Sequence, residues 1–500
     1  MSHSIRIVSI FSLVGMLLGV ALMLVRISNT LDFNEALQLV TSGAEWESMF
    51  AVWKVINGQQ LYNDRLDIPY NAVVYNWLFY NAYAAFTGVS LHLLALGDEW
   101  LPTIGRFFTL VAVASGSSGA YLVFSQLFKN ANIWTRIYCF AFAVYLTTGP
   151  LIGWWAFTLR ADIWAMALEI IAVAVFLRHY RSRPIVTVLM VALICYAAWS
   201  FKQINIFAIG ATGLFLLLRQ DWKSLFILSV ATLFLWAATL LIGGAPYREA
   251  ILFSDFTIVF AMSKGMFNLT SLASKTSPSL VLLGVLGVTF ILSSESRRKF
   301  IDDDALVLAC CGILIALLIA VPASFQTGAA DNYYFSLSFF MALAAVAGSA
   351  ILTRDGSFPK FTGYASIFGW TIHMFAIVLV LGGYQGVTDL RKQHVDHMAG
   401  KQCLDKLPRP LFTNDSYYTL PWMTPGNEPF PISFQYLVER AAGKDFKHGG
   451  IGGLIGQGYF KALAFIGQTP PPTYDGANLK NYAHRPDQCD TMAVMLKIQD

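Results

Sequence analysis

The chain has 500 residues, of which 56% are hydrophobic and only 13% are charged. This composition lies far outside the range of soluble globular domains and predicts a mainly α, polytopic membrane protein. The formal net charge is only +4, and the longest basic run is Arg297, Arg298 and Lys299. Such a weak basic signal predicts no nucleic-acid partner.

The N-terminus carries Arg6 ahead of an apolar stretch of about 20 residues, a length that can span a membrane. A secretory signal peptide would end in a small-x-small cleavage site, which is absent here. We therefore expect a retained first helix.

Eleven apolar segments have the length and composition of membrane spans. They lie near 8–27, 105–127, 133–150, 163–178, 185–201, 204–218, 224–243, 279–293, 305–321, 334–352 and 362–382. Counted this way, the basic clusters all fall on the side of the N-terminus, which the positive-inside rule places in the cytosol. An odd number of spans then predicts a C-terminus on the outer, periplasmic face of a bacterial inner membrane.

A polar loop follows the first span and gathers acidic residues among tyrosines and tryptophans. Asp32, Glu35, Glu45 and Glu47 lie in its first part. The later stretch 70–88 is rich in asparagine and tyrosine, which favours a helix lying at the membrane interface over a span. We expect one or two such juxtamembrane helices in this loop.

The chain changes character after residue 383, where prolines become frequent. This predicts two parts, a transmembrane module over 1–383 and a small outer-face domain of mixed α/β structure over 384–500. Cys403 and Cys489 lie in the second part, whereas the other four cysteines lie in apolar runs. A domain outside the cytosol permits a disulfide between these two.

Four short polar elements fall on the predicted outer face. They are Glu45-Trp46-Glu47, Arg160-Ala161-Asp162, Lys202-Gln203 and Asp331-Asn332-Tyr333-Tyr334. Each alone has a plain structural explanation: a solvated loop, a helix-end ion pair, a lysine that reaches the headgroups, or an aromatic belt. Together on one membrane face they favour a functional site, because ionisable residues at membrane depth are usually functional.

The ordered set of motifs resembles the glycosyltransferase C (GT-C) superfamily, which includes protein O-mannosyltransferases and lipid A aminoarabinose transferases. The acidic motif precedes a G-x-x-x-Y turn, here Gly58 to Tyr62. A tyrosine-rich segment from Tyr75 to Tyr80, Arg106 and the Arg160-x-Asp162 motif follow. The acidic motif departs from the family in being Glu-x-Glu and in lying well beyond the first span. Asp32 and Glu35 occupy the nearer position, so the identity of the base stays open.

The resemblance implies transfer of a sugar from a polyprenyl-phosphate donor to a lipid, glycan or protein acceptor at the outer face. Membrane lipids would surround the enzyme. It also implies roles for individual residues. Glu45 is the expected base with Glu47 in support, Lys202, Arg160 and Arg106 are expected to bind the donor phosphate, and Gln203, Asn332, Tyr333, Tyr62 and Tyr75 are expected to contact substrate. Asp162 either orients Arg160 or helps Glu45 to hold a divalent cation (Mg²⁺ or Mn²⁺), although no metal motif is visible.

Two other classes of function compete with this hypothesis. A transporter or lipid flippase would carry ionisable residues at span midpoints and paired half-repeats. Glu169 is the only mid-span acid, and no half-repeat is visible. A non-catalytic membrane scaffold would not need acids gathered on one face.

Overall fold

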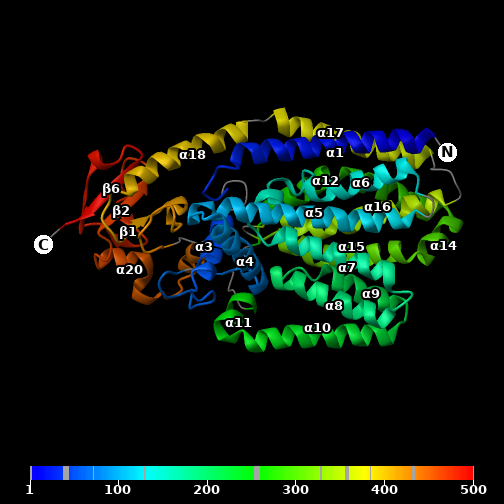
Figure 1. Cartoon of the computed structure of the whole chain (residues 1–500), viewed down its shortest axis with the longest axis horizontal. Helices are drawn as coiled ribbons and strands as arrows, with labels where there is room; N and C mark the ends of the chain where they lie inside the picture. Colours follow the sequence, from blue (N-terminus) through cyan, green and yellow to red (C-terminus); the bar gives the residue numbers. More distant parts are fainter. Residues whose placement is uncertain are drawn as a thin grey trace.

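The computed structural model describes residues 3–37, 44–70, 73–128, 131–252, 260–326, 329–354, 360–382, 385–430 and 434–498. The chain forms an elongated helical bundle with a small sheet-containing unit at one end (Figure 1). The N-terminus lies at the opposite end of the bundle from this unit. The mainly α fold class is therefore confirmed.

Every expected span coincides with a helix of the bundle. In chain order these helices are α1 (His3–Thr30), α5 (Leu101–Leu127), α6 (Ile133–Thr148), α7 (Asp162–His179), α8 (Pro184–Phe201), α9 (Phe207–Leu218), α10 (Trp222–Ile242), α13 (Ser277–Leu292), α15 (Asp304–Ser324), α16 (Phe335–Thr353) and α17 (Lys360–Gly382). Short helices α12 (Met262–Lys275) and α14 (Ser294–Asp302) flank α13.

By length and apolar composition alone, seven of the described helices can cross a membrane, or eight if α12 and α13, which meet at 83°, form one broken span. The count is below eleven because three bundle helices deviate from a simple span. Helices α6 and α9 have only 16 and 12 residues. Helix α7 carries Asp162, Glu169 and Arg178.

The expected juxtamembrane helices of the first loop are present. Helix α3 (Ala44–Ile56) and helix α4 (Trp77–Leu94) lie at the end of the bundle that carries the sheet, and α11 (Gly244–Leu252) lies beside them in Figure 1. Asn76 caps α4, and its side chain also donates to the Trp199 carbonyl of α8 at 3.0 Å. This bond ties the loop to the bundle.

The first and last bundle helices, α1 and α17, lie side by side (Figure 1). Their closest approach depends on Gly15, because a Cβ atom there would lie 2.5 Å from Cε3 of Trp370. Trp370 itself is fully buried. Any larger residue at position 15 would force the two helices apart.

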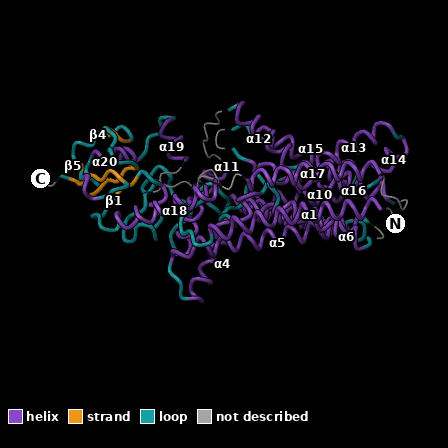
Figure 2. Tube along the Cα trace, turned by 90° about the horizontal axis from the view of Figure 1, so that it is seen from above, coloured by secondary structure: helices purple, strands orange, loops and turns teal. Residues whose placement is uncertain are grey.

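The C-terminal part combines helices with a four-stranded sheet of order β1-β2-β6-β5. Its strands are β1 (Leu411–Thr413), β2 (Ala462–Ile466), β5 (Tyr482–His484) and β6 (Met492–Lys497), with a separate hairpin of β3 (Thr473–Tyr474) and β4 (Ala477–Asn478). Strands β1 and β2 are parallel, whereas β6 is antiparallel to both of its neighbours. Figure 2 shows helices α18 (Gln385–Leu404), α19 (Phe434–Ala441) and α20 (Gly450–Gly456) around the sheet. The expected boundary at 383 and 384 lies outside the described residues.

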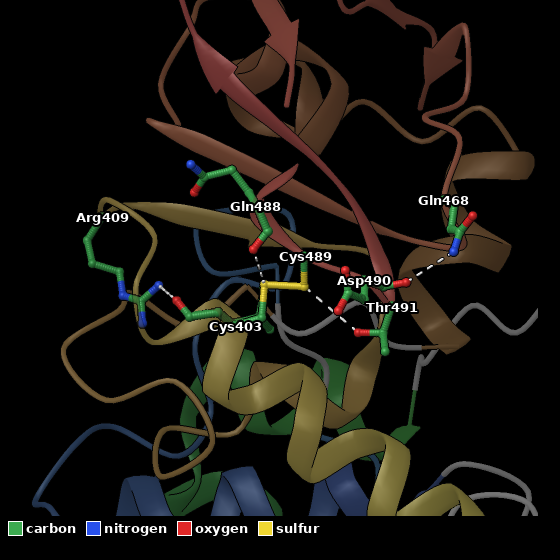
Figure 3. Close-up of a disulfide and its surroundings, with 8 residues drawn as sticks. Cys403, Arg409, Gln468, Gln488, Cys489, Asp490 and Thr491 are labelled. Atoms are coloured by element: carbon green, nitrogen blue, oxygen red, sulfur yellow. Dashed lines mark hydrogen bonds between the residues drawn. A yellow bond between two sulfur atoms is a disulfide. The ribbon is translucent and has the colours of Figure 1, made fainter. Parts of the chain in front are cut away.

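A disulfide joins Cys403, near the end of α18, to Cys489 just before β6 (Figure 3). These are the two cysteines that the sequence analysis paired. The bond fastens α18 to the residues just before β6, an interior strand of the sheet. The four other cysteines are free.

Thiol labelling of the unreduced, denatured protein is expected to modify four cysteines and to leave Cys403 and Cys489 unmodified. Because the bond closes a loop with a sequence separation of 86 residues, removing it should cost roughly 4 kcal/mol on the chain-entropy model. Mass spectrometry of the labelled peptides provides the measurement. Full labelling of both residues would contradict the pairing.

Candidate functional site

A cluster of charged side chains forms where several helices begin or end, at the end of the bundle beneath the first loop. Arg160 precedes α7, Asp162 is the first residue of that helix, and Lys202 follows the end of α8. Asn332 belongs to a short 3₁₀ helix directly before α16. These residues come from three separate sequence regions, and the bundle brings them together.

Asp162 is the centre of this cluster. Its Oδ1 accepts hydrogen bonds from Lys202 Nζ at 2.5 Å and from Asn332 Nδ2 at 2.7 Å, and its Oδ2 accepts from Arg160 Nε at 3.0 Å. Arg160, Asp162 and Lys202 are all buried. The N-terminus of α7 adds favourable electrostatics for the Asp162 carboxylate. Two cations thus share the Asp162 carboxylate in a poorly solvated place.

Aromatic rings surround the cations of this cluster. The Arg160 guanidinium lies 4.0 Å from the ring centroid of Trp155 and 5.8 Å from that of Tyr75, and Lys202 Nζ lies 5.3 Å from the ring of Tyr333. Burial raises the pKa of the Tyr75 phenol; the Arg160 charge lowers it, but the charges of Asp162 and Glu47 raise it, and the net shift is upward. Tyr75 therefore stays protonated and can donate a hydrogen bond.

Two of the expected substrate ligands instead hold the segment that carries Tyr75. The Tyr62 hydroxyl donates to the Tyr75 carbonyl at 3.0 Å, and Gln203 Nε2 donates to the Val74 carbonyl at 2.9 Å. Oε1 of Gln203 is buried and accepts no hydrogen bond from the described residues. Tyr62 is thus a positioning residue, whereas Gln203 keeps an acceptor for a ligand.

Glu45 and Arg106 form a separate, fully buried clamp. The Glu45 carboxylate accepts from Arg106 Nε at 3.1 Å and Nη2 at 3.2 Å, and from the backbone amides of Leu37 at 2.6 Å and Leu159 at 2.9 Å. Neither side chain is exposed. The ion pair joins α3 to α5, and the hydrogen bond from the Leu159 amide joins α3 to the extended segment before Arg160.

This geometry argues against two expectations from the sequence, the roles of Glu45 as base and of Arg106 as phosphate ligand. A general base must reach the proton that it removes, but both oxygens of Glu45 are already occupied and inaccessible. Arg106 also donates to the carbonyls of Phe33 and Glu35, so its guanidinium does not face the cation cluster. Glu45 and Arg106 are placed to stabilise the loop.

Glu47 points to the other side of α3, because two helical residues project about 200° apart. Its charge acts on Tyr75, whose ring lies 5.8 Å from the Arg160 guanidinium, and on Tyr80. The charge of Glu45 acts on Arg160, whereas that of Glu47 acts on the neighbouring Tyr75. Its side chain is 7% exposed.

Glu35 connects the first loop to the C-terminal helix α18. Nδ1 of His394 lies 2.8 Å from Oε2 of Glu35, and Nδ1 of His397 lies 3.5 Å from Oε1. Phe33 stacks on the His394 ring at 4.3 Å. Asp32 is 3.6 Å from Arg391 of the same helix. Both acids that follow the first span thus fasten α18 to the loop.

This connection is expected to depend on pH. The hydrogen bond to Glu35 raises the pKa of His394 above 6.5. Burial raises the pKa of Glu35, but hydrogen bonds and charge from His394 and His397 lower it more, so that the pKa of Glu35 lies below 4.5. The stability that His394 contributes is fully present below pH 6.5, and it is lost as the pH rises through the pKa of His394 in the folded protein. The stability that Glu35 contributes is fully present above pH 4.5, and it is lost as the pH falls through the pKa of Glu35 in the folded protein.

Attachment of α18 should therefore be firmest between pH 4.5 and 6.5. Limited proteolysis of the C-terminal part across pH provides the measurement, with His394→Gln as the variant that should flatten the profile. The same pH profile in the variant and the parent chain would contradict the role of this pair.

The site does not fit a resident divalent cation. Within the described ranges, no group of three or more His, Cys, Asp or Glu side chains could hold a metal ion. Asp162 already faces two cations, and Glu45 faces Arg106. The expected Mg²⁺ or Mn²⁺ therefore receives no role here.

The sequence analysis missed several residues that build this region. Trp155, which covers Arg160, belongs to the run Gly153-Trp154-Trp155 just ahead of the Arg-x-Asp motif, and this proximity was a usable signal. Glu169 accepts from the backbone amides of Phe207 and Ala208 at 2.8 and 3.1 Å and so caps the start of α9. This is a structural role for the mid-span acid, which removes the one feature that favoured a transporter.

Comparison with known proteins gives a likeness in fold. No family model and no curated protein sequence matches the chain. A solved structure does: ArnT from Cupriavidus metallidurans bound to undecaprenyl phosphate superposes with a TM-score of 0.57 at 11% identity, over 97% of this chain and 98% of that one. The chain has a GT-C glycosyltransferase-like fold. The resemblance indicated by the motifs is thus confirmed for the fold, and in this fold the charged cluster lies where α7 begins and α8 ends.

Proposed function

We propose that the protein is a membrane glycosyltransferase that moves a sugar from a polyprenyl-phosphate donor to a lipid, glycan or protein acceptor. The observation that carries the proposal is the buried cluster of Lys202, Arg160 and Asp162 on a GT-C-like fold. The bound undecaprenyl phosphate of ArnT supports a donor of the same chemical kind.

The cluster suits a lipid phosphate in charge as well as in position. Lys202 and Arg160 are two cations held together by the Asp162 carboxylate, and cations attract a phosphodiester of charge −1. As the sugar leaves, the lipid phosphate gains negative charge, and fixed cations in a poorly solvated place stabilise that charge. Asn332 supplies an amide group for the phosphate or for sugar hydroxyls, and Oε1 of Gln203 can accept a hydrogen bond from a sugar hydroxyl.

In the proposed reaction the acceptor oxygen attacks the anomeric carbon. A new C–O bond forms, the bond between that carbon and the phosphate oxygen breaks, and the lipid phosphate leaves with the electron pair. A carboxylate takes the proton from the acceptor hydroxyl, a contribution of about 10²–10⁴-fold. We assign this role to Glu47, because Glu45 is locked by Arg106 whereas Glu47 lies toward Tyr75.

We place the protein in a cell inner membrane, with the N-terminus in the cytosol and the cluster, first loop and C-terminal part on the periplasmic face. The distribution of basic residues supports this orientation. It also puts the Cys403–Cys489 disulfide in a compartment where disulfides persist.

Transfer of radiolabelled sugar from a synthetic polyprenyl-phosphate sugar in detergent tests the function. Purified protein should release free polyprenyl phosphate and label an acceptor extracted from host membranes. The double variant Arg160→Gln/Lys202→Met should do neither. Movement of the intact donor across vesicles without release of the sugar would favour a flippase instead.

A further inference from the structure

The opposite end of the bundle, far from the site above, contains an open polar cavity. It has a volume of about 620 Å³ and lies where α5 ends, α6 begins and α7 ends. In Figure 1 these three helix ends lie on the side of the N-terminus, away from the sheet. The cavity is therefore separate from the proposed sugar-transfer site by the length of the bundle.

Two arginines from different helices line this cavity. Arg136 belongs to α6 and Arg178 to the last turn of α7. No hydrogen bond or ion pair joins either guanidinium to another of the described residues, and no acid is among the residues that line the cavity. Two unpaired cations on one hollow repel each other and attract an anion.

The neighbouring groups narrow the chemistry of that anion. Tyr121, Ser125 and Gln126 of α5 contribute a phenol, a hydroxyl and an amide to the wall. Leu122, which is 52% exposed, and Phe128 provide an apolar border on the same helix end. Planar guanidinium groups bind phosphate through paired hydrogen bonds. A phosphate that carries hydroxyls and is attached to an apolar chain would satisfy all of these groups together.

We propose that this cavity binds the phosphate headgroup of an anionic phospholipid. Basic pockets between transmembrane helices bind such headgroups, whereas scattered arginines at a membrane surface interact with lipid only diffusely. The guanidinium groups would hold the phosphate diester, the α5 side chains the headgroup hydroxyls, and Leu122 the start of an acyl chain. The proposal does not depend on the sugar-transfer function.

Native mass spectrometry of the full-length protein with phosphatidylglycerol or phosphatidylcholine tests the site. The parent protein should retain phosphatidylglycerol preferentially. The variant Arg136→Gln/Arg178→Gln should lose at least about tenfold in affinity for it. The matched control Arg183→Gln/Arg298→Gln removes the same charge from other exposed arginines and should bind like the parent. Size-exclusion profiles check that all proteins remain folded.

The proposal would be overturned if the parent and the cavity variant bound phosphatidylglycerol equally well. It would also be overturned if the control variant lost as much affinity for phosphatidylglycerol as the cavity variant. A third arm uses inorganic phosphate in a thermal-shift assay. Stabilisation of the parent by inorganic phosphate, with no retention of phosphatidylglycerol, would assign the cavity to a soluble phosphate and overturn the lipid assignment.

Discussion

Replacement of Glu47 by glutamine is expected to reduce sugar transfer by at least about 100-fold while the protein remains folded. Glutamine keeps the size and hydrogen-bonding ability of the side chain but cannot accept the acceptor proton. Donor binding should be unchanged, because the phosphate ligands are untouched. Single-turnover assays and donor titration separate the two effects.

Glu45→Gln serves as the matched comparison, because it makes the same chemical change two residues away. This variant removes the partner of a buried arginine and should lower the free energy of unfolding by about 3–5 kcal/mol. Its remaining folded fraction should still transfer sugar. If Glu45→Gln is stable but inactive while Glu47→Gln is active, the roles that we assign to the two acids are reversed.

Replacement of Lys202 by methionine is expected to weaken donor binding by about 10- to 150-fold, the range for loss of one hydrogen bond to a charged group. Methionine keeps the apolar stem and removes the ammonium. The loss of turnover should exceed the loss of binding, because the charge on the phosphate grows as the sugar leaves. Titration with a non-hydrolysable polyprenyl phosphonate and rate measurements at saturation provide both numbers.

Lys264→Met is a suitable control, since Lys264 lies in α12 with its ammonium 5.6 Å from the ring of Phe267. Lys202→Arg retains the charge and should recover part of the binding. Unchanged donor binding in Lys202→Met would mean that this lysine only neutralises Asp162.

The sequence was sufficient to predict the helices, because apolar length and charge distribution determine where a chain can cross a membrane. It was also sufficient to predict that Arg160, Asp162, Lys202 and Asn332 lie near one another, since each lies at the same end of its span. Their convergence follows from topology alone.

The roles of the two acids in the loop could not be predicted in this way. Glu45 and Glu47 differ only in which side of α3 they occupy, and the partner of Glu45 lies 61 residues away on α5. The same limit applies to Glu35, whose partner His394 is 359 residues distant. Spacing within a motif contains no information about such long-range pairs.

The close contact between Gly15 and Trp370 has a consequence for how the protein is made. Helix α1, which enters the membrane first, packs in the folded protein against α17, which enters last. During synthesis the glycine-containing face of α1 must remain against lipid, or against an insertion factor, until α17 has emerged from the ribosome. Closure of the bundle is therefore a late event of biogenesis, and chains truncated before α17 would present that face to the quality-control proteases of the membrane.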